Sequence, residues 1–158
     1  MQFDVPGRPF AWKVTKDRRG VIYKKSSSPL AVYQRSVANY YKTVAWVSTP
    51  TYTLQGPDGE ITKGVKRERL FAAKGTPVKL TILAVFARPK AMKQKPDERL
   101  PKATAPDATN IQKAVEDALT GVAWADDRQV WSVACVTLYG KVGEPPFTRV
   151  QIEVTDET

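Results

Sequence analysis

The chain of 158 residues contains no histidine and a single cysteine, Cys135. Without histidine, the usual zinc sites and the Ser-His and Cys-His catalytic pairs are excluded. One cysteine cannot form an intrachain disulfide, and its Val and Ala neighbours predict a small, buried strand residue. Any metal that this chain binds is therefore expected to be a hard ion with oxygen ligands, Mg²⁺ or Mn²⁺.

Long apolar runs are also missing. No stretch of about 18 apolar residues exists, which excludes a membrane-spanning helix, and residues 1–10 lack the basic-then-apolar layout of a signal peptide. The length predicts one domain, residues 1–158, whose core needs neither disulfides nor a structural metal. We therefore expect a cytoplasmic protein with no membrane partner.

The charge is large and unevenly distributed. Residues 1–102 hold 21 Lys and Arg against 7 Asp and Glu, a net charge of +14, whereas residues 103–158 hold 4 against 9, a net charge of −5. A basic majority favours a polyanionic partner, most simply a phosphate backbone. A solvated basic surface without a ligand is the alternative, and charge alone does not distinguish DNA from RNA.

Periodicity and turn residues predict the order β-α-β-α-β-β. The longer helix should begin at Ser28-Pro29, with Ser as N-cap, and its Tyr and Val residues recur at spacings of three and four, which favours a core-facing stripe over a base-stacking platform. Residues 78–88 are apolar at nearly every position, which is typical of a central strand. The elements of this order are strands 2–5, 78–88, 129–139 and 147–155 and helices 29–47 and 110–119, with a short possible strand at 21–24 and a basic loop over 89–106.

This order indicates an α+β or mixed α/β domain with a small mixed sheet and two helices. The two last strands are separated by a short connection with Gly143 and Pro145-Pro146, which predicts a hairpin. Gly56-Pro57-Asp58-Gly59 marks a turn, and the region from there to Lys74 is a basic excursion without a clear pattern.

The segment from Pro106 to Val130 carries most of the chemistry. Successive side chains on a helix rotate by about 100°, which places Lys113 and Asp117 with Asn110 on one polar line, away from the apolar arc. Asp107 precedes that line, and the Asp126-Asp127 turn is close enough along the chain to return to it. Convergence is possible on this reasoning, although each residue also has a purely structural interpretation, as a helix-dipole residue, an i, i+4 ion pair or an ordinary turn.

Converging carboxylates would suit a metal. Carboxylates that lie within a few ångströms repel one another unless a cation neutralises them, and Mg²⁺ held by one or two carboxylates and several waters provides that cation. Such an ion activates water and stabilises the charge of an in-line displacement at phosphorus. A nearby Lys113 ammonium would add to that stabilisation or hold the scissile phosphate.

The same segment resembles the RusA-type Holliday-junction resolvases, whose pattern is close to P-D-x-D-N-x-x-K-x-x-x-D-A-L-x-G followed by D-D-x-Q-V. The opening VPGRP, residues 5–9, resembles the start of that family. Matching positions in this chain are Pro106, Asp107, Asn110, Lys113, Asp117, Ala118, Leu119, Gly121, Asp126, Asp127, Gln129 and Val130. The resemblance implies a small RusA-like dimeric, Mg²⁺-dependent endonuclease that nicks opposing strands of a four-way DNA junction. It also implies metal ligation by Asp107 and by an Asp of the 126–127 pair, a catalytic Lys113, and an origin in a phage or prophage.

Thr109 departs from the pattern, which has a second Asp there. Thr109 and Gln112 are predicted to form a capping box, so the helix start would survive the change. The hydroxyl supplies no negative charge, however, so Mg²⁺ would bind more weakly unless Asp117 or the second Asp of the pair compensates.

The leading hypothesis is a homodimeric, Mg²⁺-dependent endonuclease for branched DNA in recombination and repair, associated with the nucleoid. Asp107 and Asp127, helped by Asp126 and Asp117, would bind the metal, and Lys113 would steady the scissile phosphate. A junction binder without catalysis is the second hypothesis, and a basic RNA-binding protein is the third. The residues expected to contact the DNA backbone are Arg8, Lys13, Lys16, Arg18, Arg19, Arg88, Lys90, Lys93 and Lys95.

Overall fold

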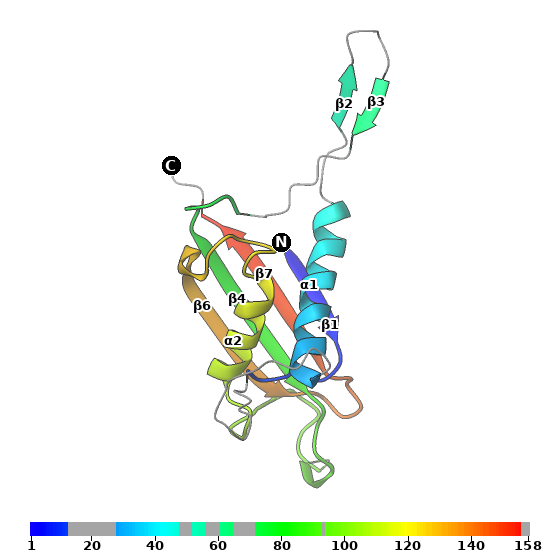
Figure 1. Ribbon diagram of the computed structural model, residues 1–158. Helices are drawn as coiled ribbons and strands as arrows, with labels where there is room; N and C mark the ends of the chain where they lie inside the picture. Colours follow the sequence, from blue (N-terminus) through cyan, green and yellow to red (C-terminus); the bar gives the residue numbers. More distant parts are fainter. Residues whose placement is uncertain (13–27, 48–51, 56–60, 65–71, 93, 156–158) are drawn as a thin grey trace.

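The computed structural model describes residues 1–12, 28–47, 52–55, 61–64, 72–92 and 94–155. It is a single α+β domain built on a five-stranded mixed sheet in the order β1-β7-β4-β6-β5 (Figure 1). Two helices, α1 (Pro29–Val47) and α2 (Ala108–Leu119), cover one face of this sheet. No helix among the described residues is long and apolar enough to cross a membrane.

The centre of the sheet is a parallel pair. β4 (Val78–Phe86) and β6 (Val130–Tyr139) run in the same direction, with Ile82 beside Cys135. Parallel neighbours require a crossover connection, and here α2 provides it. Both strands therefore end at the edge of the sheet where α2 begins, and α2 returns the chain to the start of β6 (Figure 1).

The remaining strands complete the two sides of the sheet. β7 (Phe147–Val154) pairs antiparallel with β4, and β1 (Gln2–Pro6) pairs antiparallel with β7. The two-residue β5 (Leu100–Pro101) pairs with the end of β6. A separate two-stranded ribbon joins β2 (Tyr52–Gln55) to β3 (Ile61–Gly64).

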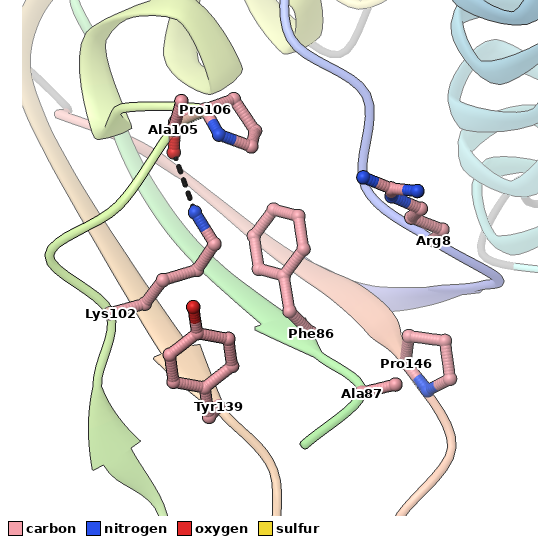
Figure 2. Close-up of a pocket in the computed structure, with 8 residues that line it drawn as sticks. All are labelled: Arg8, Phe86, Ala87, Lys102, Ala105, Pro106, Tyr139 and Pro146. Atoms are coloured by element: carbon pink, nitrogen blue, oxygen red, sulfur yellow. Dashed lines mark hydrogen bonds between the residues drawn. The ribbon is translucent and has the colours of Figure 1, made fainter. Parts of the chain in front are cut away.

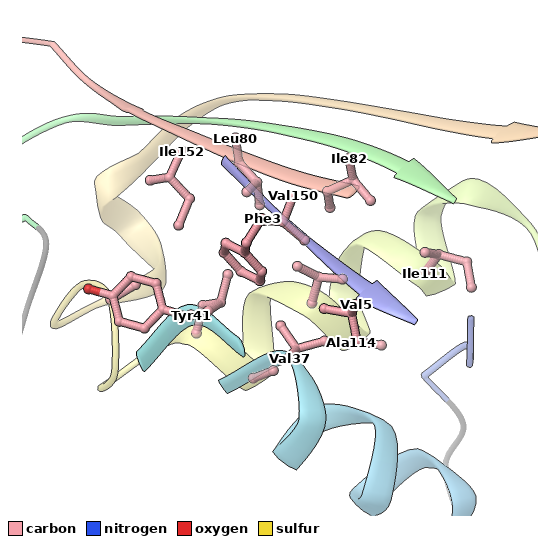
Figure 3. Packing of buried hydrophobic residues seen from close by; sticks show 14 of the residues in the cluster. Phe3, Val5, Val37, Tyr41, Leu80, Ile82, Ile111, Ala114, Val150 and Ile152 are labelled. Atoms are coloured by element: carbon pink, nitrogen blue, oxygen red, sulfur yellow. The ribbon is translucent and has the colours of Figure 1, made fainter. Parts of the chain in front are cut away.

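The core lies between the sheet and the two helices. Side chains that alternate along β1, β4 and β7 point toward α1 and α2, and Figure 3 shows this packing. The Tyr33 hydroxyl hydrogen-bonds with Thr148 Oγ1 at 2.8 Å, which satisfies two polar groups within the core. The labelled core residues are Phe3, Val5, Val37, Tyr41, Leu80, Ile82, Ile111, Ala114, Val150 and Ile152.

Most of the predicted elements are confirmed. α1 spans Pro29–Val47, and the Ser28 hydroxyl accepts from Ala31 N at 3.2 Å, as expected of a cap. The buried Tyr33 and Tyr41 confirm a core stripe, and β4 is the central strand. Gly121, whose φ of 77° lies in the left-handed region, follows the end of α2. The short strand expected at residues 21–24 lies outside the described residues.

Two expectations need correction. The predicted hairpin of the two last strands is wrong, because β4 lies between β6 and β7 and pairs with both. Closeness in sequence suggested direct pairing, but the parallel partner of β6 had to come from far along the chain. The basic loop expected over 89–106 contains a 3-10 turn, η1 (Lys90–Met92), and the edge strand β5.

One buried polar side chain joins two segments that are distant in the sequence. Gln129 ends the 3-10 turn η2 (Asp127–Gln129), and its Nε2 donates to Ala73 O at 2.6 Å and Thr76 O at 3.1 Å. Its Oε1 accepts from the backbone N–H groups of Ala125 and Asp126, each at 3.0 Å. The side chain thus fixes the chain before β4 against the turn before β6.

We predict that Gln129→Ala lowers the free energy of unfolding by about 2 kcal/mol or more, because it leaves several buried backbone groups without partners. The matched control is Gln112→Ala, which removes a single bond to the Glu116 side chain and should cost about 0.5 kcal/mol. Urea unfolding followed by circular dichroism measures both. Equal losses in the two variants would contradict a joining role for Gln129.

Candidate active site

Asp107 is the N-cap of α2. Its Oδ1 accepts from Asn110 N at 2.8 Å, and its Oδ2 accepts from the Asn110 side-chain amide at 3.1 Å. The capping box predicted for Thr109 and Gln112 is therefore wrong, because Gln112 Nε2 donates instead to Glu116 Oε1 at 3.0 Å. Asp107 remains exposed, so its carboxylate faces solvent at the positive end of the helix dipole.

Lys113 lies six residues further along the chain, nearly two turns into α2. Its ammonium is 5.2 Å from the centre of the Trp12 ring and 3.7 Å from Asp117 Oδ1. Trp12 is held beside the helix because its backbone N–H donates to Asn110 O at 2.8 Å. Half of the Lys113 side chain is exposed, and the pair with Asp117 is long, so the ammonium is free to move toward an approaching phosphate.

The Asp126-Asp127 pair lies at the other end of α2, at the start of β6 (Figure 1). Asp126 caps η2, and its carboxylate binds the Arg128 guanidinium at 2.6 and 3.0 Å. These hydrogen bonds from Arg128 hold the Asp126 pKa well below its ordinary value. Asp126 thus has a structural task in this chain, as the cap of a turn.

Asp127 is close enough to Glu116, in the last turn of α2, for its charge to act on that carboxyl. The half-buried Glu116 carboxyl has a raised pKa, mainly because of burial and further because of the nearby charges of Asp117 and Asp127. Glu116 lies nine positions after Asp107, which corresponds to about 13 Å along the helix axis. The convergence that the sequence allowed is therefore not present within one chain.

The oxygen donors fit a metal only in part. Among the described residues, no group of three or more Asp, Glu or Cys side chains is placed to hold a metal ion. Asp107 has an exposed carboxylate that suits a Mg²⁺ ion shared with water and substrate phosphates, and the carboxylates of Asp117 and Asp127 are exposed as well. Ligation by Asp117, Asp126 and Asp127 remains a prediction that the arrangement of a single chain does not meet.

A cavity of about 280 Å³ opens beside Asp107, at the ends of β1, β4 and β6 (Figure 2). Lys102 Nζ lies in it, 4.5 Å from the centre of the Phe86 ring. Burial, and then the charge of Arg8, lower the pKa of Lys102, whereas the charge of Asp107 raises it. The lining residues are Arg8, Phe86, Ala87, Lys102, Ala105, Pro106, Tyr139 and Pro146.

The basic loop after β4 projects from the same end of the sheet (Figure 1). Lys90 and Lys95 are exposed there, as a DNA contact requires. Arg88 has a structural role instead. Its guanidinium donates to Gly140 O at 2.9 Å, to Pro96 O at 2.9 Å and to Glu98 O, and these hydrogen bonds stabilise the loop. The other predicted contacts, Lys13, Lys16, Arg18, Arg19 and Lys93, lie outside the described residues.

Comparison with known protein families shows to which family the chain belongs. The family model of the endodeoxyribonuclease RusA matches residues 7–155, which is nearly the whole chain. The chain belongs to the RusA family. A search of curated proteins found no match. RusA proteins are endodeoxyribonucleases that act on Holliday-junction DNA, which agrees with the basic surface around Asp107.

The sequence did not predict two parts of the site in this RusA protein, the residues of the cavity and the half-buried Glu116. Lys102 lies in a run of loop residues that resembles any other basic loop, and Tyr139 and Phe86 look like ordinary strand residues. Nothing in their local pattern predicts that they share a cavity, because that depends on the parallel pairing of β4 with β6. Glu116 was missed as well, since only burial distinguishes it from a surface helix residue.

An ion pair anchors the loop that carries Pro146 into the cavity. Arg99 Nη2 lies 2.5 Å from Glu144 Oε1, and Glu144 Oε2 accepts from Lys141 N at 2.9 Å. These contacts, the hydrogen bonds from Arg99 first, lower the pKa of Glu144 from 4.5 to about 2. A carboxyl with a lowered pKa stabilises the fold above its unfolded-state value and ceases to do so as the pH falls through its folded-state value.

We therefore predict that the wild-type chain loses stability between about pH 5 and pH 2 by more than Glu144→Gln does. The variant should be less stable near pH 7 and should approach the wild type at pH 2. Urea midpoints at pH 7, 4 and 2.5 measure the difference. A gap between the two proteins that stays constant with pH would contradict the role given to the Glu144 charge.

Proposed function

We propose that this RusA protein is a Mg²⁺-dependent endonuclease that resolves Holliday junctions by paired symmetric nicks, with Mn²⁺ as a possible substitute. The observation that carries the proposal is the exposed carboxylate of Asp107 at the first turn of α2, in a family of endodeoxyribonucleases. Arg8, Lys102 and Lys113 surround that end of the domain with positive charge. A DNA backbone is the polyanion that such a surface favours.

The position of each charged residue suggests its role in cleavage. Asp107 supplies a carboxylate for a Mg²⁺ ion, which when bound would polarise a phosphate and activate water. Lys113, which contacts the Trp12 ring and makes a long contact with Asp117, would neutralise charge that develops on the phosphate. Lys90 and Lys95 on the projecting loop would contact the backbone of a neighbouring arm.

The test is cleavage of a synthetic four-way junction by the full chain in Mg²⁺. We expect symmetric nicks for the wild type and a loss of at least about a hundredfold for Asp107→Asn, which keeps a good N-cap and therefore a folded helix. Glu98→Gln is the matched control, since it also removes one exposed negative charge and should cut normally. Absence of nicks in the wild type, or full activity in Asp107→Asn, contradicts the proposal.

A second candidate function is junction binding without cleavage. It rests on Thr109, which is exposed in the first turn of α2, where the helix carries no acidic residue. If the chain is a binder, Thr109→Asp gains cleavage that the wild type lacks. If the chain is a nuclease, the wild type already cuts and the variant only binds metal more tightly.

Paired nicks require two active sites related by a two-fold axis, so we further propose a homodimer. The sheet face opposite the helices would form its interface. One row across this face consists of Asp4, Arg149, Leu83 and Val136, in which Asp4 and Arg149 form an ion pair. Val136 is 48% exposed, and Trp131 on the same strand is 62% exposed. Apolar exposure on this scale, beside charges that are already paired, suits a second copy of the same face.

Val136→Glu should therefore convert the protein to a monomer, because it places an unpaired charge within a buried interface. Val32→Glu is the matched control: Val32 is also 48% exposed, but it lies on the outer side of α1. Analytical ultracentrifugation gives the mass of each variant. A wild type that is monomeric at micromolar concentration, or a dimeric Val136→Glu, contradicts this interface.

A further inference from the structure

Two cations share the cavity beside Asp107. Arg8 enters it from the chain that follows β1, and Lys102 enters it from the opposite side, just before the Ala105-Pro106 step (Figure 2). Within the described ranges, neither side chain forms an ion pair with a carboxylate. The cavity therefore holds two positive charges whose anion is not supplied by the described parts of the chain.

Lys102 is fixed in place. Its ammonium donates to Thr104 O at 2.6 Å and to Pro106 O at 2.9 Å, and it lies over the Phe86 ring. An ammonium has three N–H donors, so one remains for a ligand. The Tyr139 hydroxyl, bonded to Thr104 Oγ1 at 2.8 Å, holds the other side of the same loop. A donor held this firmly loses little conformational freedom when an anion arrives.

The volume and the walls of the cavity indicate which kind of anion it can bind. A volume of about 280 Å³ is at the lower limit of small-molecule pockets, which suits one phosphate with its sugar better than a large cofactor. The walls formed by Phe86, Pro106 and Pro146 are apolar and can pack against a deoxyribose. Because Lys102 is bonded to the carbonyl of Pro106, the residue before Asp107, the cavity adjoins Asp107, where the proposed function places the scissile phosphate.

We propose that Arg8 and Lys102 jointly bind one phosphate of the DNA strand that is not cut. This phosphate is next to the scissile phosphate, which lies at Asp107. This inference rests on the proposed function for the identity of the strand, although it concerns binding rather than cleavage. A phosphate bound in the cavity would fix the position of the DNA strand, and so determine which phosphodiester bond lies at Asp107. Lys102 acts here as a positioning residue.

The test measures binding of the full chain to a four-way junction in Ca²⁺, over a range of salt concentrations. Lys102→Gln and Arg8→Gln should each weaken binding a few-fold and make the slope of log K against log salt less steep. Because one phosphate is shared, the slope of the double variant should change by about one in total. A change of about two means two separate phosphates and overturns the proposal, as does no change. Lys42→Gln, exposed on α1, is the control and should bind as the wild type does.

Junctions that carry a single uncharged methylphosphonate identify the phosphate. Wild-type binding should fall at one position adjacent to the cut, and Lys102→Gln should show no further loss there. Equal sensitivity of both proteins at every position overturns the proposal. Arg8 is exposed and makes no hydrogen bond within the described residues, so Arg8→Gln keeps the test valid if Lys102→Gln fails to fold. A chain that binds in this way but never cuts would refute the nuclease and leave the phosphate site standing, in which case the position is mapped relative to the branch point.

Discussion

The parallel pairing of β4 with β6 is the constraint on which the site depends. Because α2 is the connection between these strands, its N-terminus must lie where both strands end. Ligand sites of α/β sheets lie at the carboxyl ends of strands for the same reason. Asp107, the cavity and the basic loop therefore share one end of the domain, and none of them could be moved without changing the crossover.

The same constraint separates the acidic residues. A helix of 12 residues between Asp107 and the turn at Asp127 places them at opposite ends of α2, because α2 and the turn after it must return the chain to the start of β6. Sequence spacing allowed the acids to meet, since an eight-residue connection is long enough to fold back. In the structure that connection is used instead to enter β6, through a turn in which Gly121 N donates to Trp124 O at 2.6 Å.

Local signals in the sequence predicted local structure well. Ser28-Pro29 fixed the start of α1, the apolar run of β4 gave its central place, and Gly121 gave the end of α2. Pairings between distant segments could not be predicted in this way, because nothing in 129–139 or 147–155 indicates that β4 separates them. The N-cap was misassigned for a related reason: Thr109 and Asp107 are both good caps, and the difference lies in where the helix begins.

Recognition of the family depended on the motif rather than on the geometry, and the two contribute differently. The motif predicts Asp107 and Lys113 as site residues, whereas the geometry shows what surrounds them. The cations around a carboxylate attract a polyanion, whereas the carboxylate's own negative charge repels the phosphate unless a metal cation stands between the two. An Asp107 that faces solvent beside Arg8, Lys102 and Lys113 suits both conditions, because the cations would attract the proposed strand and the exposed carboxylate is open to a hydrated ion.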